Sequence, residues 1–210
     1  MNDRALTELR DLARRDAELA GQADGLRSRD RDVAEIRARA EAIDAFFAAY
    51  PEHGASRRAA VADAEAAIAD RREEFALAQA VLARSREENA RAYAQHAVDR
   101  ARDHIDVAEA GLRRAEGELA ALEREAATFP DELTELEQRA DADVTGARGL
   151  VEWASHTHAE LFVAAGQIDA QRERLSREAH ELASMLLGEP TFGATIAQAL
   201  ARVEARLPDH

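Results

Sequence analysis

Apolar residues recur along this chain in columns that repeat every seven positions. One column occupies 5–47, a second occupies 61–82 and resumes over 98–126, and a third occupies 133–182. A seven-residue period keeps each column on one side of a slightly under-wound helix, which predicts long helices that supercoil left-handedly. No segment is predicted to be a strand, so the expected fold class is all-α.

Helix-breaking residues divide this pattern into segments. Pro51 with Gly54 forms one break, Pro130 a second, and Gly188 with Pro190 a third, in the order typical of a helix C-terminus. We expect an elongated bundle over 1–187, followed by a turn and a short amphipathic helix within 188–210. The expected helices are about 3–49, 56–128, 131–187 and 194–206.

Two glycines, Gly146 and Gly149, fall inside the third expected helix. Each weakens a helix by about 1 kcal/mol relative to alanine, so a kink is expected there. A complete break at 145–149 is the alternative. We favour a continuous helix because the apolar column passes both glycines without a polar interruption.

The lengths of these segments predict how they pack. Short connections make consecutive helices antiparallel, so the first and third helices run back along opposite ends of the second. Together they exceed its length, and they are expected to overlap beside 71–102 as a three-helix segment between two-helix arms. The run 161–165 is apolar on nearly every face, as a helix with two neighbours would be. The seam changes phase near Asn89, which we attribute to the third helix arriving rather than to a polar residue that fixes register.

Composition agrees with long helices and reduces the number of function classes that this chain could belong to. Roughly a quarter of the residues are alanine, and aromatic residues make up 4%, so burial is expected in thin seams between helices. Arginine is used without any lysine, as a GC-rich bacterial genome would produce. The net charge of −14 disfavours nucleic acid and anionic lipid as partners. The absence of cysteine excludes disulfides, thiolate zinc sites and cysteine nucleophiles.

Localisation is predicted from the same sequence. The first residues contain no apolar signal region, and no apolar run approaches the length that spans a membrane. We therefore expect a cytoplasmic protein without membrane insertion.

A metal site is the main chemical alternative. Glu152, His156 and Glu160 are spaced four apart on one helix face, and turn counting places His104 at the same level. Such a set could bridge a divalent metal. The favoured interpretation is a solvated polar face with pairs four residues apart, and no cofactor is expected.

Catalysis is not expected. The serines lie in helical or turn context without a Gly-rich elbow, and no glycine loop follows a strand to hold phosphate. A bundle two or three helices wide also offers little room for a pocket.

Apolar residues that are not required for packing between the expected helices are candidates for contact with another chain. The apolar residues on one face of the expected tail helix, the tail stripe, either dock on the bundle or bind a partner. Trp153 is expected to be a packing residue. The expected function is therefore that of a scaffold, spacer or adaptor, as a homodimer or a hetero-complex; the alternative is a helical bundle that binds metal or a small ligand. The candidate partner-binding residues are Phe46, Phe47 and Tyr50 at the first expected turn, and Ile196, Leu200, Val203 and Leu207 in the tail.

Overall fold

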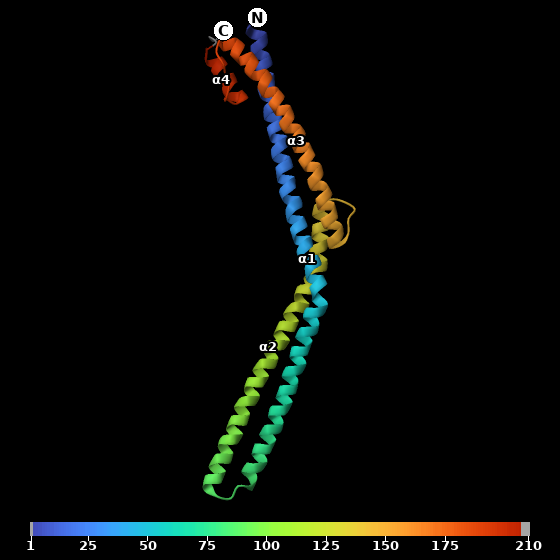
Figure 1. Ribbon diagram of the computed structural model, residues 1–210, viewed down its shortest axis with the longest axis vertical. Coiled ribbons are helices and arrows are strands. Elements are labelled where there is room, and N and C mark those ends of the chain that lie inside the picture. Colours follow the sequence, from blue (N-terminus) through green and yellow to red (C-terminus); the bar gives the residue numbers. More distant parts are fainter. Residues whose placement is uncertain (1, 207–210) are drawn as a thin grey trace. The chain divides into compact units, whose positions relative to one another are not determined.

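The protein is a packed bundle of four helices, three long and one short at the C-terminal end (Figure 1). The computed structural model describes residues 2–206, and this span contains no strand. The prediction of an all-α fold is therefore confirmed. The helices are α1 (Asn2–Arg84), α2 (Glu88–Ala140), α3 (Gly146–Leu187) and α4 (Ile196–Arg206).

The chain divides into two compact units, and α1 contributes to both. The hairpin unit is Glu41–Leu136, and the terminal unit is Met1–Ala40 with Glu137–His210. The expected division into a bundle over 1–187 and a tail over 188–210 stays a prediction about domains.

In the hairpin unit, the second half of α1 and most of α2 lie side by side and antiparallel (Figure 1). Arg57 pairs with Glu118, and Arg72 Nη2 lies 3.3 Å from Glu109 Oε1. Residue numbers of the partners on α2 therefore fall as those on α1 rise, as in any antiparallel pair. The seam between the helices is apolar, as the seven-residue columns predict. Its buried side chains are Ile43, Ile68, Ala94, Val98, Ala101, Phe129 and Leu136.

The expected breaks at Pro51 and Pro130 are both wrong, because α1 and α2 continue through them. A proline inside a helix removes a hydrogen bond and costs about 3 kcal/mol. Aromatic contacts lie directly N-terminal to each proline: the ring centroids of Phe46 and Phe129 are 4.7 Å apart, and Phe129 is only 3% exposed. We attribute the continuity of both helices to this packing, which offsets the cost of the prolines.

The turn between the first two helices lies at 85–87 instead, without glycine or proline. The Ser85 amide donates to the Val81 carbonyl at 3.1 Å, and Ser85 Oγ donates to the same carbonyl at 2.9 Å. The phase change near Asn89 therefore marks a turn, not the arrival of a third helix. The predicted three-helix segment beside 71–102 depended on the wrong bounds, since those residues enclose this turn.

In the terminal unit, the first part of α1 runs antiparallel to α3 (Figure 1). Asp16 pairs with Arg172 at 2.8 Å, and Asp30 with His158 at 2.5 Å. Trp153 is half-buried, with the Arg29 guanidinium 5.8 Å from its ring, as a packing residue would be. The buried side chains of this unit include Val33 and Ile36 of α1 and Leu150 and Ala154 of α3.

Arg172 and Asp16 form a partly buried ion pair in this seam, with side chains 34% and 22% exposed. The hydrogen bond from Arg172 to Asp16 is the main reason that the pKa of Arg172 is raised, and burial opposes it. The guanidinium is charged at any physiological pH, so Arg172 presents a permanent positive charge to Asp16 across this seam.

The expected continuous helix over 131–187 is also wrong, because residues 141–145 separate α2 from α3. Asp141 and Gly146 adopt left-handed backbone conformations, with φ of 51° and 74°. The Gly146 amide at the start of α3 donates to Glu137 Oε1 at 2.6 Å, which satisfies one free helix-end donor. Ala140 and Ala147 are seven apart whether or not a turn intervenes, so the column could not reveal this break.

The end of α3 is where the sequence predicts it. Gly188 is left-handed, with φ of 69°, and its amide donates to the Ser184 carbonyl at 2.9 Å. Thr195 and Gln198 then cap α4 reciprocally, through bonds of 2.8 and 3.2 Å between backbone amides and side-chain oxygens. Thr191 in the connection is fully buried, with its Oγ1 2.9 Å from His180 Nδ1.

Docking of α4 creates a core made by three helices. One cluster of buried residues joins α1, α3 and α4, so the tail stripe packs on its own chain rather than projecting from it. By contrast, Leu161, in the run 161–165 that the sequence predicts to have two neighbouring helices, is only half-buried. The cluster consists of Leu9, Leu12, Ala179, Ala183, Ile196, Ala199 and Val203.

Candidate functional site

The aromatic residues predicted at the first turn lie inside α1, in the hairpin unit. Phe46 and Tyr50 are half-buried, and Phe47 is 42% exposed. Both phenylalanines contact Phe129 of α2, with ring centroids 4.7 and 5.6 Å away. These rings hold the two helices together, and Phe129, which the sequence reasoning missed, is the residue that they surround.

The predicted tail stripe is mostly unavailable to a partner in this fold. Ile196 is 3% exposed and Val203 1%, and Leu200 is half-buried against the same cluster. Leu207 lies outside the described residues. The alternative in which the tail docks on its own bundle is therefore the one that the structure shows.

The four predicted metal-binding residues are divided between the two units. His156 Nε2 lies 3.2 Å from Glu160 Oε1, with side chains 77% and 66% exposed, and Glu152 is exposed on the same helix. His104 belongs to α2 in the hairpin unit, whereas the other three belong to the terminal unit. Within residues 2–206, no group of three or more carboxylate or imidazole side chains is arranged to hold a metal ion.

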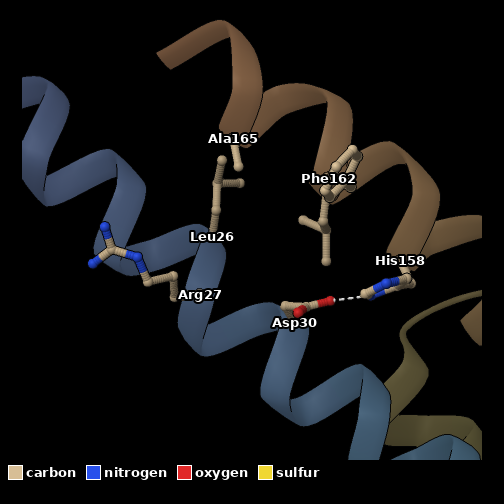
Figure 2. A pocket seen from close by; sticks show the side chains of 7 residues that line it. Leu26, Arg27, Asp30, His158, Phe162 and Ala165 are labelled. Carbon is tan, nitrogen blue, oxygen red and sulfur yellow. Dashed lines mark hydrogen bonds and ion pairs between the residues drawn. The ribbon is translucent and has the colours of Figure 1, made fainter. Parts of the chain in front are cut away.

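A small cavity opens between α1 and α3 in the terminal unit (Figure 2). A hydrogen bond between Asp30 and His158 closes one end of the cavity. Its apolar lining consists of Leu26, Leu161, Phe162 and Ala165. Its volume is about 100 Å³, below the range of about 300–1,000 Å³ typical of small-molecule sites. The cavity fits a few waters and no substrate of metabolite size.

Two larger hollows are grooves along the helix pairs, one in each unit. The groove in the terminal unit has a volume of about 410 Å³ and is bordered by Glu18 and Arg174, among others. The groove in the hairpin unit has a volume of about 530 Å³ and contains the ion pair of Arg57 with Glu118. Most of the side chains that line each groove are polar or charged, which suits surface pairing better than burial of a ligand.

Large apolar side chains on outward faces are the feature that sequence reasoning missed. Three of them flank the turn of the hairpin unit: Tyr93 is 80% exposed, Leu77 62% and Val81 58%. We call this set the hairpin end. The antiparallel register places Val81 level with Tyr93, because both lie within six residues of the turn at 85–87. A second exposed pair, Phe162 and Val163, lies on α3.

A sequence signal for the hairpin end exists. Leu77 and Val81 are four residues apart and outside the column that contains Phe75 and Leu82, so they form a second apolar face of α1. This face becomes a candidate only once the turn lies at 85–87, because a turn at Pro51 would leave Leu77 and Val81 in mid-helix.

None of the described helices is long and apolar enough to cross a membrane. Comparison with known protein families, curated proteins and solved structures finds no match to this chain.

Proposed function

We propose that this protein is a non-enzymatic scaffold, spacer or adaptor, built from antiparallel coiled coils, that binds another protein through its hairpin end. Two-helix coiled coils expose most of their surface, and function in such proteins resides in what the outward faces present. The observation that carries the proposal is the exposure of Tyr93, Leu77 and Val81 beside one turn.

Packing within the hairpin does not account for these three side chains. The seam beside the turn is already filled by Phe75, Leu82, Ala94 and Val98, which are buried or half-buried. Exposed apolar side chains that cluster on a surface are typical of contact sites, and tyrosine is among the residues enriched at their centres.

Charged residues surround this apolar set. Arg84, Arg86 and Arg91 lie in or beside the turn, together with Glu87 and Glu88, and all five are exposed. An apolar centre with a polar rim is the usual anatomy of a protein interface. Three arginines within eight residues also make this end less acidic than a chain of net charge −14 as a whole. The expected partner therefore presents an apolar patch bordered by acidic side chains.

The test is affinity purification from the native host with the full chain as bait. The variant Leu77→Ser/Val81→Ser/Tyr93→Ser should lose a co-purifying protein that wild type retains. Phe192→Ser is the matched control, because Phe192 is 84% exposed in the terminal unit and should leave binding unchanged. If wild type and the triple variant retain the same proteins, the proposal for the hairpin end is refuted.

A further inference from the structure

The outward face of α3 carries an apolar stripe that its own unit leaves largely exposed, although Phe162 at the edge of this stripe also lines the cavity of Figure 2. Phe162 is 76% exposed and Val163 58%, and the small residues in line with them are exposed as well. The spacings of three, four, seven and eleven residues place all five on one side of the helix. Leu150, Ala154 and Ala179, which are fully buried, lie on the opposite side. The stripe consists of Ala159, Phe162, Val163, Gly166 and Ala170.

Gly166 in this stripe has no role in the packing of its own chain. A Cβ atom built there meets nothing within 4 Å, and its backbone is not among the glycines with positive φ. Glycine in the middle of an exposed helix weakens that helix relative to alanine. Its effect on the surface is a hollow one turn away from the protruding ring of Phe162, so the face offers both a knob and a hole.

We propose that α3 of a second copy of this chain packs antiparallel on this face, related by a two-fold axis beside residue 164. Because the axis lies midway between Phe162 and Gly166, each ring is placed over the glycine of the other copy. Large and small side chains then interdigitate twice, as an isologous interface requires.

The charges that border the stripe favour this orientation. The same axis places Glu152 of one copy level with Arg177 of the other, and both side chains are exposed. The two-fold symmetry forms this pair twice. A parallel arrangement would instead set Glu152 against Glu152 and Arg177 against Arg177, which repel. Charge complementarity therefore selects a second copy in antiparallel register.

This self-association is separate from the partner binding proposed at the hairpin end. It uses α3 of the terminal unit, whereas the hairpin end uses α1 and α2 of the hairpin unit. Either proposal can fail without the other, because the variants that test them share no residue.

Sedimentation equilibrium of the full chain over a range of concentrations tests the proposal. Wild type should show a reversible monomer–dimer equilibrium, and Phe162→Ser/Val163→Ser should raise its dissociation constant by at least about tenfold. Gly166→Gln should weaken the dimer similarly while leaving helix content by circular dichroism unchanged, because the monomer has open space there. Phe192→Ser should sediment as wild type does.

Disulfide trapping tests the orientation, since the chain has no cysteine of its own. Ala159→Cys and Ala170→Cys lie at opposite ends of the stripe and meet across an antiparallel interface. Mixed together, the two variants should form a cross-linked heterodimer, and neither alone should cross-link to itself. A wild-type monomer at every concentration, a dimer insensitive to Phe162→Ser/Val163→Ser, self-cross-linking of Ala159→Cys, or a monomer that binds a different protein through this stripe would each overturn the proposal.

Discussion

Replacing Val203 by alanine should loosen α4 from the terminal unit, because this side chain lies in the core that α4 shares with α1 and α3. Val203 is 1% exposed, and it packs in the same cluster as Leu9, Leu12 and Ala183. The substitution removes two methyl groups from a site that α1 and α3 would have to move to fill.

The magnitude follows from burial. Each buried methyl group contributes about 0.8 kcal/mol, so the transfer loss is about 1.6 kcal/mol. The remaining cavity adds to this loss, while the better helix propensity of alanine returns a few tenths of a kcal/mol. We expect α4 to be destabilised by about 1.5–2.5 kcal/mol, which raises the population of its undocked state by roughly 10- to 60-fold.

Hydrogen exchange of the α4 amides is the appropriate assay, because two compact units need not unfold in one step. Val107→Ala is the matched control: it removes the same atoms from a side chain that is 72% exposed in α2. That control should leave the α4 amides unchanged. Equal exchange rates of the α4 amides in Val203→Ala and in wild type would refute the docked arrangement of α4.

Three further predictions test other parts of the structure. Pro51→Ala should stabilise the hairpin unit by up to about 3 kcal/mol in thermal or urea unfolding, since α1 is continuous there; a loss of stability would show that Pro51 belongs to a turn. Asp16→Asn should lower the free energy of unfolding by about 1 kcal/mol, because it removes the ionic partner of Arg172, and this loss should be smaller in high salt. A loss below about 0.2 kcal/mol would show that this pair does not determine the register of α1 against α3. Metal analysis of protein purified without chelator should find less than one equivalent, and stoichiometric metal lost on His156→Ala would favour the metal-binding alternative.

The seven-residue columns predicted which residues face a neighbour more reliably than they predicted where helices end. Val33, Ala40, Ile68, Val98 and Ala154 all belong to predicted columns, and all are buried. The reason is that burial depends on the face a residue occupies, and the period specifies that face directly.

Where a helix ends depends on local backbone preferences, such as those of proline and glycine, and these compete with tertiary packing. Pro51 and Pro130 predict turns, but the aromatic side chains around them pack well enough to keep α1 and α2 continuous. The turn at 85–87 contains no strong breaker, and its trace in the sequence was the loss of phase between Leu82 and Val98. Reading that loss as a turn would have placed the hairpin correctly.

The candidate binding residues depend on where the helices are predicted to end. Phe46, Phe47 and Tyr50 precede an expected turn, but the structure places them in mid-helix, with both phenylalanines against Phe129. Leu77 and Tyr93 flank the turn that exists, which the sequence does not predict. Prediction of an interaction site in a helical hairpin thus depends first on where the chain reverses.

Photo-cross-linking from position 93 in cells of the native host tests the proposed function most directly. A photoreactive phenylalanine analogue replacing Tyr93 should yield a discrete adduct with one protein, because this side chain is 80% exposed at the hairpin end. The same analogue at Phe192, which is 84% exposed in the other unit, should not yield that adduct. No adduct from position 93, or the same adducts from both positions, would contradict the proposal that this protein acts by binding a partner through its hairpin end.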